Sequence, residues 1–532
     1  MPSLAMKWLF PSLLLLLTLQ GLAAPRPAAP FADGAVLQQG KLVPVWGSAE
    51  PGERITVAFR DQRVSTTADA SGGWQVLLTA LEPSAEEAEL SIQGTTTVTL
   101  RRILVGEVWL CAGQSNMQWP VEHCDNAAAE ISAARFPLLR HAQFLPVTDT
   151  GGGTAQSLAW QEASPANAAK FSAVAYFFGR NLHRKTGIPI GVIQVSVPGS
   201  PIEGWLSHAA LSAPPGLPFV IARWQEDQAA FPARQQAYQT SLAEWQKGEK
   251  KAREAGPAKH SAYLQKRRQP REPQLHAPSS YFNSLIAPLL PFAVRGVVWY
   301  QGEANAARPS QYGHYEQTLR AFIHSLRGHF ADPALPFLQV QLGAYSNPND
   351  PREQNWAVLR QAQAAVLDIP NTGLVVSLDL DVTKTVHPTN KQEIARRLSQ
   401  TALATIYQQD TEYLGPTVRS AQVVQGRVRI DFDHAATGLI AYRKPVQSLE
   451  VAGADGRFFP ATATIQGNAL LLSCPSVPIP KAVRYAWSNA PYANLANGSG
   501  FPAAPFQLTE LASTADGATP APLSASGPAD SK

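Results

Sequence analysis

The middle of the chain alternates short apolar runs with longer stretches that have helical spacing. Runs suited to buried strands lie at 107–112, 138–144, 190–197, 294–300, 336–342 and 373–379. Stretches with helical spacing lie at 171–185, 315–330, 353–367 and 391–407. Strands that alternate with helices favour a parallel sheet covered by helices on both faces. The pattern therefore predicts an α/β domain with a doubly wound parallel sheet over residues 103–410.

The regions on either side of this domain show short alternating strands separated by turn residues. Residues 30–102 contain runs such as 54–59 and 73–78, which predict a small N-terminal β-sandwich with a structural role. Residues 411–508 contain runs such as 427–432 and 469–473. They predict a C-terminal β-domain, so that antiparallel β-domains flank the α/β domain.

One segment interrupts the α/β pattern. Residues 224–276 are rich in Gln, Lys, Arg, Glu and Ala. This composition is typical of a solvated helical excursion that ends in a Pro-rich linker. A second interpretation is a basic flap over the site that attracts anionic substrates. We prefer the first interpretation.

The two ends of the chain have distinct compositions. Residues 1–24 combine Lys7, an apolar run at 8–19 and a small-residue exit, which predicts a signal peptide. The apolar run is shorter than the roughly 20 residues of a membrane span. We therefore expect export to the periplasm or the extracellular space, with no membrane association after signal removal. Residues 509–532 hold almost nothing to bury, so we expect a disordered tail.

Charge and cysteine content narrow the picture further. The chain has 44 Lys+Arg against 40 Asp+Glu, a balance too even to indicate nucleic acid or an anionic membrane as a partner. Its cysteines are Cys111, Cys124 and Cys474, and an odd number leaves at least one unpaired. Cys111 either pairs with Cys124 or packs in the core, and we expect Cys474 to be a core residue. Nothing in the sequence indicates an oligomeric state.

The first candidate for chemistry is Ser115. The strand at 107–112 runs into Gly113, Gln114, Ser115 and Asn116. Ligands of open α/β sheets bind beyond the carboxyl ends of the strands, so Ser115 lies where a nucleophile between two amides would act. The side chains of Gln114 and Asn116 are candidate substrate contacts. The same residues are also typical of an ordinary turn. The residues at the ends of the other strands must distinguish a nucleophile from an ordinary turn.

Three other strand ends supply complementary groups. Gly199 follows the strand at 190–197 and offers a backbone N–H to an oxyanion, while Asn305, after 294–300, offers a side-chain amide. His387 follows the strand at 373–379 and is a candidate general base.

Two further polar residues precede Asn305 on the same loop. Gln301 and Glu303 either contact the substrate or brace the loop, because buried amides and carboxylates need partners of their own. For Glu303 we prefer the bracing role.

Together these blocks resemble the sialate O-acetylesterase family of SGNH-type hydrolases. The resemblance rests on the runs 113–117, 199–205, 299–305 and 387–388, and it extends from about residue 30 to residue 506. It implies a flavodoxin-like α/β hydrolase domain that removes acetyl groups from sugars or polysaccharides without a metal or cofactor. By position, the resemblance makes Ser115 the nucleophile, His387 the base, and Gly199 and Asn305 the oxyanion donors.

The sequence departs from the family in one respect. Members of the family commonly have Asp two or three residues before the histidine, whereas this chain has Thr385 and Lys384 there. Either Asp379 or Asp381 reaches back to the imidazole, or the site works as a Ser-His dyad in which a backbone carbonyl holds the ring. We prefer the dyad.

Two alternatives to a sialate esterase remain open. In one, the chain is a non-catalytic sugar-binding protein in which Trp119 and Trp205 stack on sugars. In the other, the same chemistry acts on acetylated xylan, pectin or another plant or algal glycan. No residue of the sequence can be named as the one that binds the carboxylate of a sialic acid.

Overall fold

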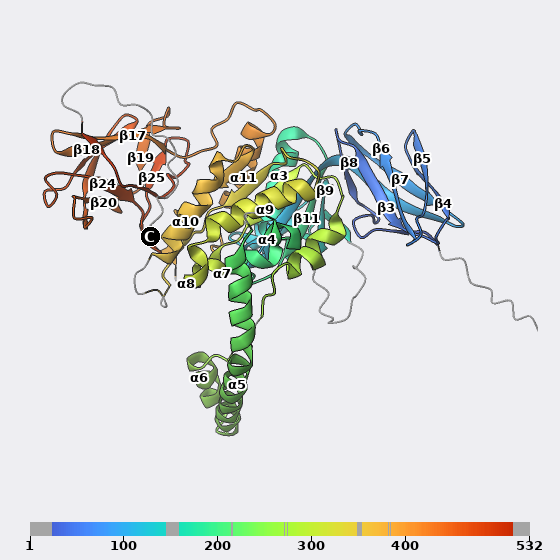
Figure 1. Ribbon diagram of the computed structural model, residues 1–532, viewed down its shortest axis with the longest axis horizontal. Coiled ribbons are helices and arrows are strands. Elements are labelled where there is room, and N and C mark those ends of the chain that lie inside the picture. Colours follow the sequence, from blue (N-terminus) through green and yellow to red (C-terminus); the bar gives the residue numbers. More distant parts are fainter. Residues whose placement is uncertain are drawn as a thin grey trace, which may run out of the picture.

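The computed structural model describes residues 24–144, 159–213, 216–270, 272–273, 275–347, 350, 354–380, 382–383 and 385–513 (Figure 1). The predicted signal peptide up to residue 23 and the tail from residue 514 lie outside the described residues.

A mainly parallel sheet forms the centre of the molecule. Its strands follow in the order β10 (Trp160–Ala163), β9 (Phe136–Phe144), β11 (Ile190–Ser196), β8 (Thr97–Gly113), β12 (Gly296–Tyr300), β13 (Phe337–Val340) and β15 (Thr372–Val375). Neighbours from β9 to β15 pair in parallel. The edge strand β10 pairs antiparallel with β9. The α/β arrangement expected for the middle of the chain is confirmed, and the sheet is mixed because of this one edge.

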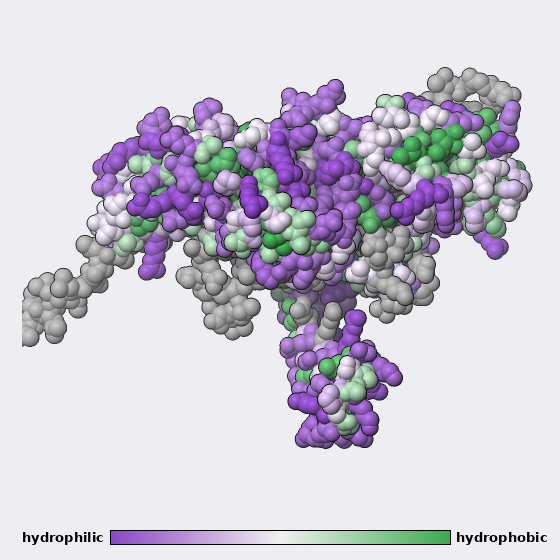
Figure 2. Space-filling view, turned by 180° about the vertical axis from the view of Figure 1, so that it is seen from behind, coloured by the Kyte–Doolittle hydropathy of each residue, from purple (hydrophilic) through white to green (hydrophobic). Residues whose placement is uncertain are grey.

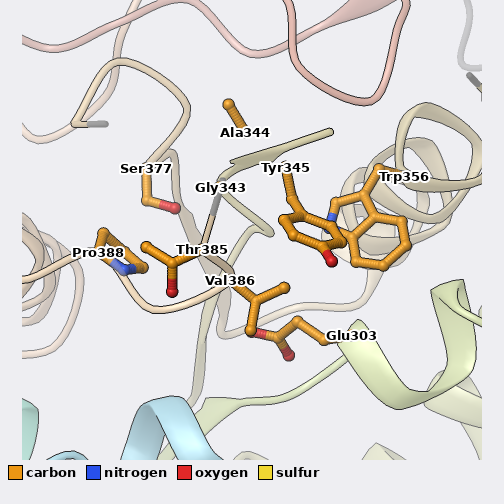
Figure 3. A pocket seen from close by; sticks show the side chains of 9 residues that line it. All are labelled: Glu303, Gly343, Ala344, Tyr345, Trp356, Ser377, Thr385, Val386 and Pro388. Carbon is orange, nitrogen blue, oxygen red and sulfur yellow. The ribbon is translucent and has the colours of Figure 1, made fainter. Parts of the chain in front are cut away.

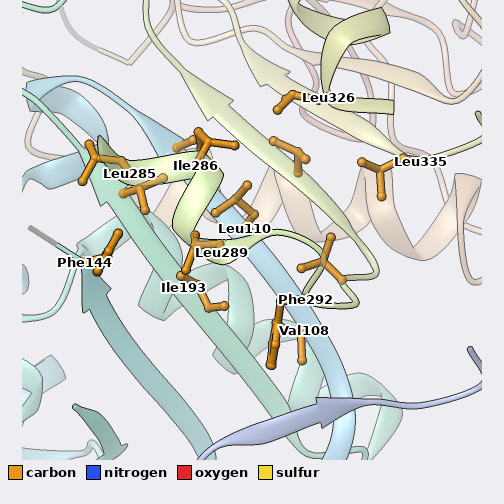
Figure 4. Packing of buried hydrophobic residues seen from close by; sticks show 14 of the residues in the cluster. Val108, Leu110, Phe144, Ile193, Leu285, Ile286, Leu289, Phe292, Leu326 and Leu335 are labelled. Atoms are coloured by element: carbon orange, nitrogen blue, oxygen red, sulfur yellow. The ribbon is translucent and has the colours of Figure 1, made fainter. Parts of the chain in front are cut away.

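Helices cover both faces of this sheet. The pair α3 (Ala173–Thr186) and α11 (Lys391–Thr405) packs on one face, and α9 (Tyr315–His329) and α10 (Asn355–Ala365) pack on the other. Alternate side chains of β8 enter the two cores, because successive residues of a strand point to opposite faces. Val108 and Leu110 join the α9 side (Figure 4), whereas Trp109 and Cys111 join the α3 side.

Strand β8 also joins the sheet to the N-terminal β-region. Its first half pairs with β2 (Val36–Gln38) and β7 (Ser84–Gln93), and its second half pairs with β11 and β12. The boundary expected at residues 102–103 therefore lies inside one continuous strand of 17 residues. The remaining strands of this region are β1 (Arg26–Pro27), β3 (Val43–Ser48), β4 (Arg54–Phe59), β5 (Gln62–Thr67) and β6 (Gly73–Leu78).

The C-terminal β-region packs against the α/β body. Its strands are β17 (Thr417–Val424), β18 (Arg427–Asp433), β19 (Leu439–Ala441), β20 (Leu449–Ala452), β21 (Phe458–Pro460), β22 (Thr462–Gln466), β23 (Ala469–Ser473), β24 (Ala482–Tyr485), β25 (Leu495–Asn497), β26 (Phe506–Leu508) and β27 (Ala512–Ser513). Arg360 of α10 fixes the junction, because its buried guanidinium donates to the carbonyls of Leu342 and Gly343 on one side and of Ser488 and Asn489 on the other.

The charged excursion forms a two-helix arm of α5 (Pro218–Glu254) and α6 (Pro257–Lys266). The arm projects away from the body (Figure 1), and its surface is mostly hydrophilic (Figure 2). At its tip, Trp245 and Tyr263 pack on each other with their ring centroids 6.1 Å apart. Within the described part of the chain, no helix has the length and apolar character needed to cross a membrane.

Short elements complete the described structure. They are α1 (Ser115–Gln118), α2 (Ala127–Ser132), α4 (His208–Ser212), α7 (Glu303–Ala306), α8 (Pro309–Tyr312), β14 (Ala344–Tyr345) and β16 (Val382–Thr383). Single helical turns lie at Val121–His123, Ala168–Lys170, Ile202–Trp205, Phe282–Ile286, Ala287–Leu289 and Val366–Asp368.

Candidate active site

Ser115 lies directly beyond the carboxyl end of β8. The strand ends at Gly113, where φ is +149° and a Cβ would lie 2.2 Å from the carbonyl oxygen of Tyr300. Only glycine fits this close approach. Gln114 then precedes α1, which begins at Ser115. The chain thus turns sharply at the sheet edge and leaves the Ser115 side chain half-buried.

His387 faces Ser115 across the sheet edge. Its Nε2 lies 2.8 Å from the Ser115 Oγ, although the two residues are 272 positions apart in the chain. The imidazole stacks on the indole of Trp119, with centroids 4.9 Å apart. Burial, and then the charge of Lys391, lower the pKa of His387 below its usual 6.5. A neutral imidazole in this position can accept the proton of the hydroxyl.

One of the two carboxylates proposed to complete a triad, that of Asp379, is engaged elsewhere. Both oxygens of Asp379 lie 2.7 Å from Arg397 in a bidentate ion pair, so Asp379 does not orient His387. The expectation for Asp379 is corrected accordingly. Asp381 lies outside the described residues.

A buried polar network connects the nucleophile loop to the base loop. The Asn116 Nδ2 donates to the Glu303 carboxylate and, over 2.8 Å, to the carbonyl of Val386, the residue before the histidine. The Lys391 Nζ donates to the Asn116 Oδ1. Asn116 is 1% exposed and Glu303 8%, so both brace the loops. The substrate contact expected of Asn116 is corrected, and of the two roles left open for Glu303 the bracing role is the one observed.

Lys391 is the member of this network that sequence reasoning did not assign. It is 0% exposed, and burial lowers its pKa to about 7, although the Glu303 carboxylate opposes that shift. Burial raises the pKa of Glu303. The sequence did carry one signal for this residue. Lys391 lies in the first turn of α11, where the helix dipole disfavours positive charge.

A small cavity adjoins the network on the side of α10 (Figure 3). Its volume is about 10 Å³, room for about one water molecule. Glu303, Ser377 and Trp356 are among the residues that line it. Among the described contacts, the Glu303 Oε2 has no hydrogen-bond partner.

The two expected oxyanion donors differ in availability. Gly199, with φ +71°, is exposed, and its N–H makes no hydrogen bond among the described contacts. Asn305 is buried, and its Oδ1 accepts from the Ile202 N–H and from the Gln301 Nε2. The Asn305 Nδ2 donates to Glu203 over 3.0 Å, and its second hydrogen has no acceptor among the described contacts.

Three expected substrate contacts are corrected by burial. Trp205 is 0% exposed and packs on Tyr281 and Trp299, so it cannot stack on a sugar. Gln301 is buried and holds the Ser200 carbonyl and the Tyr315 hydroxyl. Gln114 is likewise buried. Of the expected contacts, Trp119 stays partly exposed beside the histidine.

The cysteines play no part in cross-linking the described structure. Cys111, Cys124 and Cys474 are all free and buried. Of the two readings for Cys111 and Cys124, core packing is the one observed. The expected core position of Cys474 is confirmed.

Comparisons with known proteins agree with the motifs. Residues 276–405 match the family model "Carbohydrate esterase, sialic acid-specific acetylesterase". The sialate O-acetylesterases of Mus musculus and Homo sapiens are each 27% identical over 492 residues. These matches cover 84% of this chain, 86% of the mouse protein and 84% of the human protein.

A solved structure extends this similarity over the fold. The crystal structure of a carbohydrate acetylesterase from Xanthomonas citri is 33% identical in sequence and superposes with a TM-score of 0.76. The match covers 91% of this chain and 99% of that chain. The chain therefore belongs to the family of carbohydrate acetylesterases that includes the sialate O-acetylesterases, and it is a carbohydrate O-acetylesterase.

Proposed function

We propose that this protein is an exported serine esterase that removes O-acetyl groups from carbohydrates through an acetyl-enzyme on Ser115. The observation that carries the proposal is the 2.8 Å contact between the Ser115 Oγ and the His387 Nε2. The α/β region then acts as an SGNH-type hydrolase domain over 103–410, with accessory β-domains at 30–102 and 411–508. Residues 1–24 direct export.

In the first half-reaction, His387 takes the hydroxyl proton while the Ser115 Oγ attacks the acetyl carbonyl. The tetrahedral oxyanion is stabilised by the N–H of Gly199 and the remaining amide hydrogen of Asn305. His387 then gives its proton to the departing sugar oxygen, leaving the acetyl-enzyme. In the second half, water loses a proton to His387 and attacks the same carbonyl, and His387 then gives that proton to the departing Ser115 Oγ as acetate is released.

The imidazole in this scheme works without a described carboxylate partner. Its position is held instead by stacking on Trp119 and by the Asn116 contact to the Val386 carbonyl. These contacts support a Ser-His dyad. A dyad fixes the ring but stabilises the imidazolium less than a buried carboxylate would.

The test of the mechanism is Ser115→Ala, with Ser284→Ala, an exposed serine, as the matched control. We expect the rate on p-nitrophenyl acetate to fall on the order of 10⁴-fold or more in the first variant and to stay unchanged in the second. Mass spectrometry of wild-type protein quenched during turnover should find one acetyl group on the peptide that contains Ser115. An active Ser115→Ala protein, or an acetyl group on another peptide, would refute the assignment.

Two classes of acetylated substrate are proposed. Acetylated sialosides are favoured by the named relatives, and the alternative is an acetylated polysaccharide such as xylan or pectin. Acetate release from each of these, compared at equal ester concentration, separates the two. Amino-terminal sequencing of protein collected outside the cytoplasm tests the export step.

A further inference from the structure

A second concavity lies in the C-terminal β-region, apart from Ser115. It has a volume of about 720 Å³ and is lined by residues of β20, by the turn into β22 and by the segment after β24. The volume is within the range of about 300–1,000 Å³ that small-molecule sites have. We call it the C-terminal cleft, and three side chains decide its chemistry: Glu450, Arg484 and Trp487.

Trp487 supplies a flat apolar face. Its side chain is partly exposed, and among the described residues it stacks on no other ring. Among the described residues, none accepts a hydrogen bond from its indole N–H. Trp205 and Trp299, in contrast, are buried against each other. A partly exposed indole with a free N–H suits a ligand that has both an apolar face and hydroxyl groups.

Arg484 and Glu450 supply a fixed donor and a fixed acceptor. They lie opposite each other on β24 and β20, and the Arg484 Nε donates to the Glu450 Oε2 over 2.7 Å. The guanidinium also lies 4.1 Å from the ring centroid of Phe458, which holds it in place. Its Nη groups make no hydrogen bond with the described residues, so they can donate to a ligand.

Among the residues that line the cleft, Glu450 and Arg484 are the charged ones, and their charges cancel. An anionic sugar would meet the Glu450 carboxylate beside the guanidinium. Neighbouring hydroxyls of a neutral sugar can each donate and accept, which matches the pair.

We propose that the C-terminal cleft binds a neutral stretch of the glycan chain that carries the acetyl group, with Trp487 stacked on one sugar ring and the Arg484–Glu450 pair on its hydroxyls. The inference rests on the proposed function and deepens it, because the cleft favours the neutral acetylated polysaccharide over the sialoside that the names of the relatives suggest.

Hydrogen bonds through α10 connect the cleft to the candidate active site. Ser488, beside Trp487, accepts from Arg360, and the Asn489 Oδ1 accepts from the Trp356 N–H over 2.9 Å. Gln354 lines the cleft, and Trp356, two residues later, lines the small cavity beside Glu303. The start of α10 therefore lies between the two concavities and fixes their spacing.

The first test measures binding alone, by isothermal titration calorimetry with xylohexaose, mannohexaose, hexagalacturonate and sialyllactose. None of these carries an O-acetyl ester, so the result is independent of Ser115. We expect at least one neutral oligosaccharide to bind wild-type protein. Trp487→Ala and Arg484→Gln should each weaken that binding at least about 10-fold, the loss that follows from about 1.4 kcal/mol of contact energy. Tyr442→Ala, an exposed aromatic of the same region outside the cleft lining, should not.

The second test links the cleft to catalysis. We expect Trp487→Ala to lower the ratio of kcat/KM on acetylated xylan to kcat/KM on p-nitrophenyl acetate by about 10-fold, by the same contact energy. Absence of binding by the neutral oligosaccharides, binding of the acidic ones only, or binding that survives both cleft variants would overturn the proposal. Activity of Ser115→Ala would instead overturn the nucleophile, and it would leave the calorimetric result standing.

Discussion

Lysines in two regions of this molecule show what burial does to the same side chain. Lys391 lies fully buried under the candidate active site. Its ammonium is hydrogen-bonded to Asn116, and the Glu303 carboxylate stabilises its charge. Lys250 and Lys251 lie on the arm and are exposed to solvent. A buried charge without a partner costs several kcal/mol, whereas a solvated charge costs almost nothing. The comparison teaches that charge carries structural information only where water is excluded.

The largest effect is expected from Lys391→Met. The substitution leaves the Glu303 carboxylate buried without its counter-charge, so we expect the free energy of unfolding to fall by about 3–5 kcal/mol. Urea denaturation at about pH 6.5 measures the loss, because the lysine, with a pKa of about 7, is mostly charged there, whereas a lower pH would protonate Glu303, whose pKa burial raises. The double variant Lys391→Met with Glu303→Gln removes both charges and should recover most of the stability. A loss of less than about 1 kcal/mol in the single variant would show that the charge of Lys391 does not compensate the Glu303 carboxylate.

Asn116→Ala should have the next largest effect, on catalysis. The substitution removes the hydrogen bond to the Val386 carbonyl, which holds the loop that carries His387. Because a displacement of about 1 Å of a catalytic group can cost about 10²-fold in rate, we expect kcat on p-nitrophenyl acetate to fall by about that factor while KM changes little. Gln118→Ala, in the same short helix, is the matched control. A kcat within about twofold of wild type would show that Asn116 does not position the base.

A smaller effect is expected in the pH profile. The reaction needs neutral His387, whose pKa is lowered first by burial and then by the charge of Lys391. The acid limb of kcat/KM should therefore lie below pH 6.5, the ordinary histidine value. Lys391→Met removes the repelling charge, which should move the acid limb to higher pH. If the acid limb stayed in place or moved to lower pH in the variant, the charge of Lys391 would not lower the pKa of His387.

The same comparison explains how far the sequence could be read. The strands near 107–112 and 190–197 were predictable because continuous apolar runs buried on both faces have no other stable arrangement in a fold of this class. Ser115, Gly199 and His387 follow such runs, so their location at one sheet edge was predictable as well. Their roles were named by the resemblance to a known family.

The contacts around the site could not be predicted in the same way. Whether Asn116 and Trp205 face a substrate or the core depends on side-chain direction and on packing against segments far away in the chain. Asp379 illustrates the limit, because Arg397 on α11 donates hydrogen bonds to both of its carboxylate oxygens. The continuous β8 hid the domain junction, since the pattern of a strand does not reveal which sheets it joins.

The smallest effect is expected on the arm, from the double substitution Lys250→Glu and Lys251→Glu. Both side chains are exposed on α5. The buried residue of this helix is Val220, near the start of the helix. We expect the free energy of unfolding to change by less than about 0.5 kcal/mol, although the net charge of the arm changes by four units, because solvent screens charges at this distance from the core. Urea denaturation under the conditions used for Lys391→Met makes the two measurements comparable. If the arm variant lost as much stability as Lys391→Met, its lysines would have partners of their own, and exposure alone would not distinguish the two regions.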